Sequence, residues 1–552
     1  MMRWLRRQRR NRTTHAVGAP LRHAGSLVGD GAADAGAAPR ASAPADDAVL
    51  GVLIIGAGFS GIGTAIRLLQ EGRSDFRIVD KAAGIGGTWW VNRYPGCACD
   101  IPSHLYSFSF EPNPDWTRRY SGQPEIRDYL VGCVRKHGLE RFLRLNTEIV
   151  RLRWIESASR WEATTADGSV VHARTVVAGT GALSRPDDRP DIPGLASFAG
   201  KVFHSQQWDE DYDLRGRRVG VIGTGASAIQ FVPAIQPQVG HLTVFQRNPP
   251  WILPKLDRAI SPRERGLLRR LPGWRLLSRL AIYLASEVRV LGFAFDPRLM
   301  FLHRKMAAWH LRRQVADPEL RRKLTPQYHI GCKRILMSND YYPAMAAANT
   351  ILATEAIVAI DRDGVRTADG RHHPLDALIL GTGFRASAPY PPGMIFGVDG
   401  RDLAEVWRDG PEAYKGTTVS GFPNFFLLMG PNTGLGHNSM IYMIESQIAY
   451  VIDTLRTMTA RGLTRVDVRA DAQDRFNQRL LRRMRGAVWA IGGCNSWYRH
   501  PVSGRNVVVW PGFTWMFRLL TRRFDAEAYH LSSEPARAHA PRSAHAEDRA
   551  PA

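Results

Sequence analysis

The feature that most constrains the fold is an apolar run that ends in a glycine-rich turn. The segment "AVLGVLIIGAGFSGIG" begins at residue 48 and places Gly56, Gly58 and Gly61 before an apolar-periodic stretch that continues to about residue 70. A strand, a tight turn and a helix in this order let the backbone approach a pyrophosphate, whose negative charge meets the helix N-terminus. The sequence therefore predicts a Rossmann-like unit that binds a dinucleotide.

A second copy of this unit follows in "RRVGVIGTGASAIQFVPAI". Asp80 ends the strand that follows the first glycine turn, and Arg247 takes the equivalent place, at the same spacing, after the second. A carboxylate accepts hydrogen bonds from ribose hydroxyls, whereas a guanidinium pairs with a 2′-phosphate. We therefore expect an unphosphorylated ribose at the first site and NADPH rather than NADH at the second. The alternative is a second unit that binds nothing, with Arg247 facing solvent.

Two further apolar strands, at 175–182 and 376–384, each run into a Gly-Thr-Gly turn and bracket the second unit. A chain that returns to its first sheet before and after an inserted domain has this pattern. We predict an α/β fold of two Rossmann-like domains, the second inserted in a discontinuous first. The predicted parts are a first domain at 48–197 and 376–524, a connector at 198–210, a second domain at 211–375 with a helical insertion at about 257–328, and disordered tails at 1–47 and 525–552.

Charge and cysteine content narrow the class of protein. The net charge of +23 invites a nucleic-acid interpretation, but the arginines are scattered over helical faces without a nucleic-acid-binding motif, so we expect no such partner. The five cysteines are odd in number and lack a repeating ligand spacing. This pattern argues against a disulfide framework and against a metal site, and it favours a cytoplasmic location.

One segment, residues 265–295, is basic and amphipathic in places. Glu287 and Arg289 interrupt its apolar portion, so it cannot span a membrane. The favoured interpretation is a helical insertion that covers the active site, and peripheral membrane contact is the less favoured alternative.

The connector carries the most specific motif of the chain. In "FAGKVFHSQQWD" the fixed residues are Phe198, Gly200, His204, Trp208 and Asp209. They resemble, at every fixed position, the fingerprint of the type I Baeyer-Villiger monooxygenases. The resemblance implies an FAD domain followed by an NADPH domain, and a linker that couples their movements.

Two other segments extend this resemblance. In "GGTWWVNRYPGCACD" the match implies a loop along FAD, with Asp100 placed to orient a catalytic arginine. In "GCKRILMSNDYYP" it implies that Lys333 joins Arg247 at the 2′-phosphate and that Arg334 is that arginine. The cofactor-binding residues expected from the glycine motifs and the resemblance together are Gly56, Gly58, Gly61, Asp80, Lys81, Gly87, Thr88, Trp89, Tyr94, Asp100, Gly223, Gly225, Ser227, Arg247, Lys333, Thr382 and Asn432.

The segments at 430–447 and 494–517 are similar to the branch of the family that includes hydroxyacetophenone monooxygenase and actinobacterial flavoenzymes. They imply a substrate pocket at 494–517, with Asn432 and Thr433 near the isoalloxazine edge.

The activity implied by the resemblance is NADPH- and O₂-dependent conversion of a small apolar ketone to an ester or lactone through a flavin peroxide. The closest alternative is a flavin monooxygenase that oxidises amine nitrogen or sulfur, and the Trp208–Asp209 ending favours the ketone. A pyridine-nucleotide disulfide reductase would need a redox cysteine pair, and Cys97 and Cys99 are separated by a single residue in the flavin loop.

Overall fold

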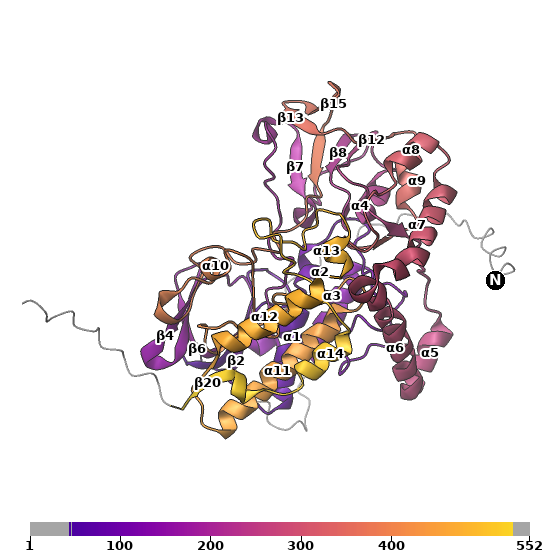
Figure 1. Ribbon diagram of the computed structural model, residues 1–552. Coiled ribbons are helices and arrows are strands. Elements are labelled where there is room, and N and C mark those ends of the chain that lie inside the picture. The colour runs from indigo at the N-terminus through magenta and orange to yellow at the C-terminus, as the bar shows by residue number, and fades with distance from the viewer. Residues whose placement is uncertain (1–43, 46, 534–552) are drawn as a thin grey trace, which may run out of the picture. The chain divides into compact units, whose positions relative to one another are not determined.

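A computed structural model describes residues 44–45 and 47–533 (Figure 1). Apart from residues 44, 45 and 47, the predicted N-terminal tail lies outside the described residues. The described elements form two separate sheets, the first mixed and the second parallel, with helices packed on them, which confirms the predicted α/β class.

The first sheet is built around β1, whose six residues are all buried. Strands that are buried on both faces read as continuous apolar runs, which explains the strand signal before the first glycine turn. Strand β6 pairs in parallel with β1, and its ends pair with β5 and β18. The eight described strands of this sheet are β17 (Ile395–Phe396), β4 (Ile149–Ile155), β5 (Arg160–Thr165), β6 (Val170–Ala178), β1 (Leu50–Ile55), β2 (Phe76–Val79), β3 (Leu143–Arg144) and β18 (Phe425–Leu427).

Three helices, α1, α3 and α11, share the apolar core on one face of the first sheet. Gly63 lets α1 approach this core, because a Cβ there would lie 3.0 Å from the Ile448 side chain of α11. The helices associated with this half of the chain are α1 (Phe59–Gln70), α2 (Thr88–Val91), α3 (Gln123–Lys136), α10 (Leu403–Val406), α11 (Met440–Ala460), α12 (Ala470–Met484), α13 (Val488–Ile491) and α14 (Thr514–Leu520).

The second sheet is fully parallel, and α4 (Ala228–Ile235) follows its central strand β8. Its strands, in spatial order, are β12 (Thr350–Ala353), β9 (His241–Phe245), β8 (Arg218–Ile222), β16 (Ala377–Leu380) and β7 (Lys201–His204).

The second sheet corrects two predicted boundaries. Strand β16 was expected to return to the first sheet at residue 376, but it pairs in parallel with β8 and β7 of the second. The chain rejoins the first sheet only at β17. An apolar strand that runs into a Gly-Thr-Gly turn is compatible with either sheet. Only the strands with which β16 pairs show to which sheet it belongs. The connector is also partly a strand, because β7 forms the edge of this second sheet.

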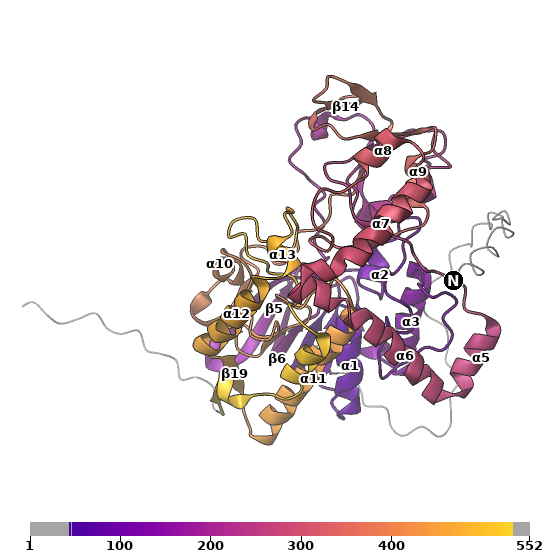
Figure 2. The same cartoon turned by 45° about the vertical axis from the view of Figure 1, so that its right-hand side comes forward.

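The segment predicted as a helical insertion runs along both domains, as Figures 1 and 2 show. Near its start, Arg279 donates a hydrogen bond of 2.6 Å to the carbonyl of His104 beside the first sheet. At its end, the Gln246 amide donates 2.8 Å to the carbonyl of Lys323. Its elements are α5 (Pro262–Arg270), α6 (Pro272–Glu287), the π-helix η6 (Leu291–Phe295), η7 (Pro297–Met300), α7 (Phe301–Gln314) and α8 (Pro318–Lys323).

Smaller elements complete the described chain. The remaining strands and helix are β10 (Ile252–Leu253), β11 (Leu336–Met337), α9 (Tyr341–Met345), β13 (Ile357–Asp361), β14 (Gly364–Thr367), β15 (His372–Pro374), β19 (Arg465–Val468) and β20 (Tyr529–Ser532). Single 3₁₀ turns are η2 (Glu140–Phe142), η3 (Glu156–Ala158), η4 (Leu195–Ser197), η5 (Ser205–Gln207), η8 (Val398–Gly400) and η9 (Ala526–Ala528).

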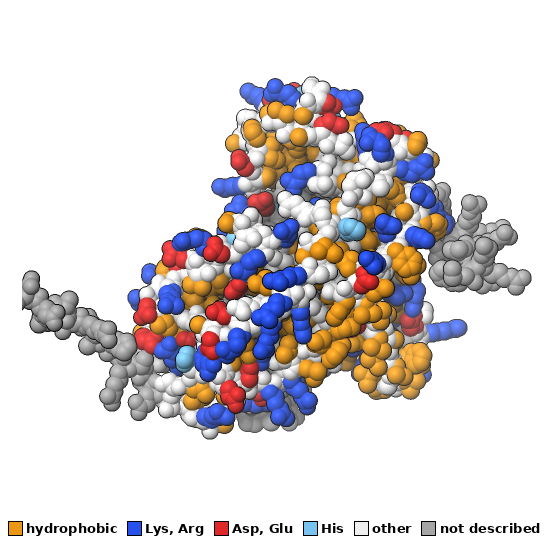
Figure 3. Space-filling view, in the orientation of Figure 1, with side chains coloured by type: hydrophobic (Ala, Val, Ile, Leu, Met, Phe, Trp, Pro, Cys, Tyr) orange, Lys and Arg blue, Asp and Glu red, His pale blue; other side chains and the backbone are white. Residues whose placement is uncertain are grey.

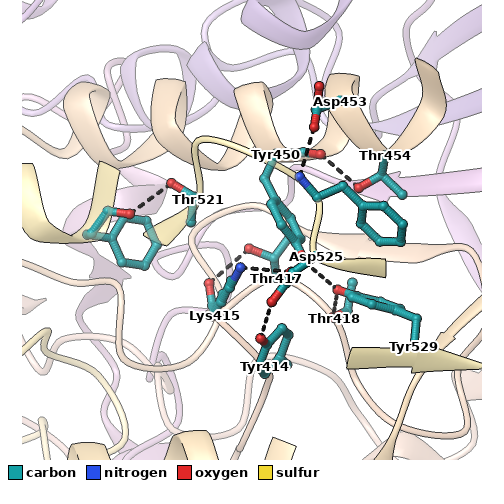
Figure 4. A network of polar contacts seen from close by, with 12 residues as sticks. Tyr414, Lys415, Thr417, Thr418, Tyr450, Asp453, Thr454, Thr521, Asp525 and Tyr529 are labelled. Carbon is teal, nitrogen blue, oxygen red and sulfur yellow. Dashed lines mark hydrogen bonds and ion pairs between the residues drawn. The ribbon is translucent and has the colours of Figure 1, made fainter. Parts of the chain in front are cut away.

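The C-terminal tail was predicted to be disordered from residue 525, and this is wrong for its first part. Strand β20 pairs with β19, and Asp525 is the centre of a polar network (Figure 4). Its carboxylate accepts hydrogen bonds from Tyr450, at 2.6 Å, and from Tyr414, and it pairs at 2.8 Å with Lys415. Lys415 is buried, so its charge needs this partner. These polar contacts hold the segment together with the packing of Tyr529 in the apolar core of the first sheet.

We expect Asp525→Ala to lower the free energy of unfolding by about 2–3 kcal/mol, because it removes three hydrogen bonds and leaves the buried Lys415 ammonium without its carboxylate. Thermal or urea unfolding measures this change. Glu527→Ala, which removes an exposed carboxylate two residues away, should change stability by less than about 0.5 kcal/mol. Equal stability of the two variants would contradict the role of the network.

Candidate functional site

The first glycine turn has the geometry of a pyrophosphate cradle. Gly56 has a φ of 111°, and a Cβ there would lie 2.6 Å from the carbonyl oxygen of Gly179. A Cβ on Gly61 would lie 1.8 Å from the carbonyl oxygen of Gly56. Gly58 faces Gly87, whose Cα would be 3.4 Å from its Cβ. Side chains are therefore excluded here, and the bare backbone before α1 fits the diphosphate of a dinucleotide.

Asp80 supports this turn and still has capacity for a ribose. Its carboxylate accepts the backbone N–H of Ala57 at 2.6 Å and that of Ala82 at 2.8 Å. Each carboxylate oxygen has a second lone pair that a hydroxyl can use. The neighbouring Lys81 is exposed and lies 3.8 Å from Glu148, so its side chain extends toward solvent.

The second glycine turn has open space at Gly225, whereas the corresponding Gly58 of the first turn faces Gly87. Gly223 has a φ of 107°, and no atom lies within 4 Å of a Cβ placed on Gly225. Ser227 immediately precedes α4 and its side chain makes no capping hydrogen bond. The space in front of this helix N-terminus fits a diphosphate.

Two cations lie beside this second cradle. Arg247 follows β9 and is exposed. The pKa of Lys333 is lowered by burial and by the nearby charge of Arg247. Two like charges held within electrostatic range favour an anionic ligand between them, and a phosphate monoester has the charge and acceptor oxygens to pair with both.

Arg334 and Asp100 form the central ion pair of the site. Arg334 Nε donates to Asp100 Oδ2 at 3.0 Å, and Nη2 donates to Oδ1 at 2.8 Å and to Oδ2 at 2.6 Å. The charge of Asp100 is the largest cause that raises the pKa of Arg334, so the guanidinium keeps its proton. The structure thus brings together two residues from distant segments that the sequence had assigned to one site.

The loop that carries Asp100 also contacts the second domain. The Tyr94 hydroxyl donates to Gln230 of α4 at 3.1 Å, and the Gln230 amide donates to the carbonyl of Ala98 at 3.0 Å. Gly96 has a φ of 80°, and a Cβ there would lie 2.7 Å from the carbonyl oxygen of Gln230. The loop was expected along FAD, and the structure fastens it to α4 of the second domain.

At the start of that loop, Gly87 has a φ of 55° and turns the chain into α2, which begins at Thr88. Trp89 is buried, and its indole nitrogen donates to the Tyr106 hydroxyl at 3.2 Å. The indole is therefore a packing element that fixes the loop.

The connector residues fasten the edge of the second sheet. Trp208 contacts Phe203 and Phe231, with ring centroids 5.2 Å and 5.4 Å away. Asp209 pairs with Lys201 at 2.6 Å. A Cβ on Gly200 would lie 2.6 Å from the Phe198 ring, so only glycine allows this packing.

His204 ends β7 in register with Leu380, next to the Gly-Thr-Gly turn. Its Nδ1 accepts the N–H of Gln206 at 3.1 Å, and its ring lies 5.8 Å from that of Phe384. Burial lowers the pKa of His204, which favours the neutral ring. His204 therefore links the end of β7 to the start of the following turn, and its role as a linker residue stays a prediction.

A cavity of about 50 Å³ opens at the carboxyl ends of β6 and β18. Its walls include Thr180, Gly181, Met429 and Thr433. Ligands of α/β folds bind at this end of parallel strands.

Of the predicted flavin-edge pair, Thr433 lines this cavity. Asn432 has a φ of 55°, and its amide donates to the carbonyls of Asn506 and Val509 at 3.0 Å and 3.2 Å, which ties the wall to the C-terminal segment. Thr382 donates to the carbonyl of Asp187 at 2.5 Å.

Two buried polar side chains were not singled out from the sequence: Tyr498, close to Arg334, and His437, whose Nε2 lies 3.8 Å from a carboxylate oxygen of Glu287. The Tyr498 hydroxyl has no hydrogen-bond partner among the described residues, and burial raises the pKa of Tyr498 to about 12. Both nitrogens of His437 also lack a hydrogen-bond partner within the described chain, and burial lowers the pKa of His437 to about 3. Buried groups without partners are costly, so a bound ligand is a reasonable source of their hydrogen bonds. A single Tyr or a single His in a polar loop is common in proteins, so nothing in the sequence indicated a role for these two residues.

The expectation against disulfides is wrong for one pair of cysteines. Cys332 is bonded to Cys494 across a sequence separation of 162. The bond joins the loop of Lys333 and Arg334 to the segment that carries Tyr498. Counting cysteines could not reveal a pair so far apart in the sequence.

The remaining cysteines, Cys97, Cys99 and Cys133, are free. Burial raises the pKa of Cys97 to about 12 and raises that of Cys99 as well, so both thiols are poor nucleophiles. This argues against a disulfide reductase. Within residues 44–45 and 47–533, no group of three or more His, Cys, Asp or Glu side chains could hold a metal ion.

The geometry as a whole defines a class of protein: a two-nucleotide oxidoreductase in which a bidentate arginine–carboxylate pair lies between two dinucleotide cradles. Comparison with known proteins agrees. Residues 50–395 match the family model described as flavin-binding monooxygenase-like.

Relatives and solved structures make the assignment specific. A Baeyer-Villiger monooxygenase of Pseudomonas aeruginosa is 60% identical over 484 residues, covering 88% of this chain and 92% of the relative. One of Streptomyces coelicolor is 48% identical over 481 residues, covering 87% and 92%. The crystal structure of OTEMO in complex with FAD and NADP superposes with a TM-score of 0.79 at 26% identity, covering 88% of this chain and 99% of that one. The chain belongs to the Baeyer-Villiger monooxygenases of the flavin-binding monooxygenase-like family.

We expect titration of the denatured protein to find three reactive thiols before reduction and five after it. Reductant should lower the melting temperature of the wild type, because releasing a long cross-link costs about 2–5 kcal/mol. Cys494→Ala serves as the control, since its melting temperature should no longer respond to reductant. A wild type with five reactive thiols before reduction would contradict the pairing.

Proposed function

We propose that this monooxygenase uses FAD, NADPH and O₂ to insert one oxygen atom beside the carbonyl group of a small apolar ketone, which yields an ester or a lactone. The observation that carries the proposal is the bidentate pair of Arg334 and Asp100, placed between the two cradles. It is the arrangement that oxygen insertion at a carbonyl requires, because negative charge develops on the carbonyl oxygen.

The cradle at Gly56, Gly58 and Gly61 would hold FAD, and the cradle at Gly223 and Gly225 would hold NADPH. When bound, these cofactors supply the reducing equivalents and the oxygen activation. Asp80 would accept hydrogen bonds from the adenosine ribose of FAD, and Arg247 with Lys333 would bind the 2′-phosphate of NADPH.

Arg334 would act as the catalytic residue. A guanidinium does not lose its proton at neutral pH, so it offers a permanent positive charge and a rigid fork of donors to a developing oxyanion. Asp100 would be a positioning residue: its two oxygens hold Nε and Nη2, which fixes the plane of the guanidinium. The contacts with Asp100 use Nε and Nη2, and Nη1 makes no hydrogen bond within the described chain, so its donors would be available to the substrate.

The surroundings of the pair favour an apolar substrate. Cys332, Trp489 and Tyr498 belong to one buried apolar cluster next to the catalytic loop. Such walls exclude water, which strengthens the electrostatic effect of Arg334. Oxidation of an amine nitrogen or a sulfur needs no donor at a carbonyl oxygen, so the Arg334–Asp100 pair favours the ketone over that alternative.

We also propose a cytoplasmic location, because NADPH is the reductant. The Cys332–Cys494 disulfide would then be an exception, because disulfides are rare in reducing compartments. No helix among the described residues is long and apolar enough to cross a membrane.

Arg334→Ala tests the catalytic role. We expect the variant to bind FAD and oxidise NADPH but to release hydrogen peroxide, with ester formation reduced by about 10²–10³-fold. Mass spectrometry of products from a mixed panel of ketones and sulfides, with a peroxide assay, measures this. Arg258→Ala, which removes an exposed arginine paired with Glu264, should behave as the wild type. Normal ester yield from Arg334→Ala would refute the role, and sulfoxide as the sole wild-type product would favour heteroatom oxidation.

Arg247→Ala tests the assignment of the second cradle. We expect the dissociation constant of NADP⁺ to rise by about 10–100-fold, because one charge-assisted contact is lost, while that of NAD⁺ changes little. Calorimetric titration of both nucleotides gives the ratio. Arg215→Ala, an exposed arginine paired with Asp213 in the same domain, is the matched control. An equal rise of the dissociation constants of NADP⁺ and NAD⁺ would exclude recognition of the 2′-phosphate by Arg247.

A further inference from the structure

Helix α6 and the π-helical turn η6 leave a stripe of large apolar side chains in solvent. These side chains recur at helical spacing and are between 38% and 63% exposed, and they are Trp274, Leu277, Leu284, Val288, Leu291 and Phe295. In a helix that packs in a globular core, such a stripe would face inward. Here it faces outward, which is unusual for a water-exposed surface of a folded protein.

The stripe continues onto α14. Tyr283 of α6 is 3.0 Å from the hydroxyl of Thr514, and Phe295 lies 5.5 Å from Phe513 between ring centroids. From α14, Trp515, Leu519 and Leu520 are 45%, 59% and 41% exposed. Together the exposed side chains of α6, η6 and α14 form what we call the apolar face, the broad orange area at the lower right of Figure 3.

The acidic residue of α6 is withdrawn from the apolar face. Glu287 is 4% exposed, and its carboxylate accepts hydrogen bonds from Asn438 and from the hydroxyl and backbone N–H of Thr514. Glu287, which with Arg289 argued in the sequence against a membrane-spanning segment, is therefore an internal clamp between α6 and α14, and it does not interrupt the exposed surface.

Basic residues flank the apolar face at the ends of its elements. Exposed ones include Arg270 before α6, Arg298, Arg304 and Lys305 after η6, and Arg522 and Arg523 after α14. Arg289, between α6 and η6, and Arg518 of α14 are also exposed, and so is one acid, Asp296, directly after η6. Figure 3 shows blue side chains beside the orange area. An apolar surface with a basic border is complementary to a bilayer whose headgroups are anionic.

We propose that the apolar face docks on the surface of an anionic lipid membrane, with its tryptophans and leucines in the interfacial region and the flanking cations at the headgroups. A second copy of this chain fits less well, because a two-fold contact between identical faces would bring the like-charged borders together. The docking would be peripheral, since no helix of the described chain can span a bilayer.

The position of η6 connects this surface to the catalytic loop. A Cβ on Gly331 would lie 3.0 Å from the Phe293 ring, and Phe293 stacks on Trp489 at 5.7 Å. The same π-helical turn thus presents Leu291 and Phe295 outward and Phe293 to the loop of Arg334. If the proposed function holds, an apolar ketone dissolved in the membrane would have a short path to the site. Docking itself does not depend on that function.

Sedimentation of the full-length protein with vesicles tests the proposal. We expect it to pellet with vesicles that contain phosphatidylglycerol, to stay in the supernatant with phosphatidylcholine alone, and to be released by high salt. The variant Leu277→Ser/Leu284→Ser/Val288→Ser should lower the partition coefficient by tenfold or more, because three exposed apolar side chains would no longer insert among the lipids.

The matched control is Val150→Ser/Val170→Ser/Val358→Ser, which removes three side chains that are 44%, 49% and 51% exposed on strands away from the apolar face. This variant should bind vesicles as the wild type does. Both variants should keep the wild-type dissociation constant for NADP⁺, which separates loss of docking from a failure of the proposed function.

Three results would overturn the proposal. One is the absence of pelleting with anionic vesicles, and another is equal binding by the α6 variant and the wild type, which would place the contact elsewhere on the chain. The third is a wild-type dimer in analytical ultracentrifugation that the α6 variant abolishes, which would assign the apolar face to a second copy.

Discussion

The bidentate contact between Asp100 and Arg334 is the interaction on which the rest of the site depends. It joins the loop that runs from Gly87, beside Gly58 of the first glycine turn, to Asp100 with the loop that follows the helical insertion. A partly buried ion pair of this kind repays its desolvation only when the geometry is good and the charges stay matched. The contacts of Gln230 with the Asp100 loop and the Cys332–Cys494 bond beside Arg334 supply that geometry from both sides.

The helical insertion has two distinct contact surfaces. Its inner surface presents Phe293 to the catalytic loop, and its outer surface carries the apolar face. Buried Glu287 links these roles, because it holds α6 against α14 and keeps a carboxylate away from the exposed stripe. A wall of the active site and a membrane-docking surface are thus placed on opposite sides of one short segment.

Much of the fold and part of the site could be read from local patterns. The turns at Gly56 and Gly223 are set by backbone geometry that only glycine adopts at low cost, so the residues themselves reveal the cradles. The sheet to which β16 belongs could not be read this way, because its partners β7 and β8 are distant in sequence. The sequence also could not show that the chain is ordered around Asp525. Polar contacts, which leave no apolar periodicity in the sequence, help to hold this segment in place.

The sequence by itself determined the two Rossmann-like units, their order, the choice of Asp80 and Arg247 at their ends, and the motifs that mark the family. These depend on residues near one another in the chain, whose spacing reports local backbone conformation. Only the tertiary structure decided which residues meet across long separations: Cys332 with Cys494, Tyr498 near Arg334, and Glu287 with Thr514. It also decided that the leucines of α6 face solvent, because helical periodicity defines an apolar face but not the surface that covers it.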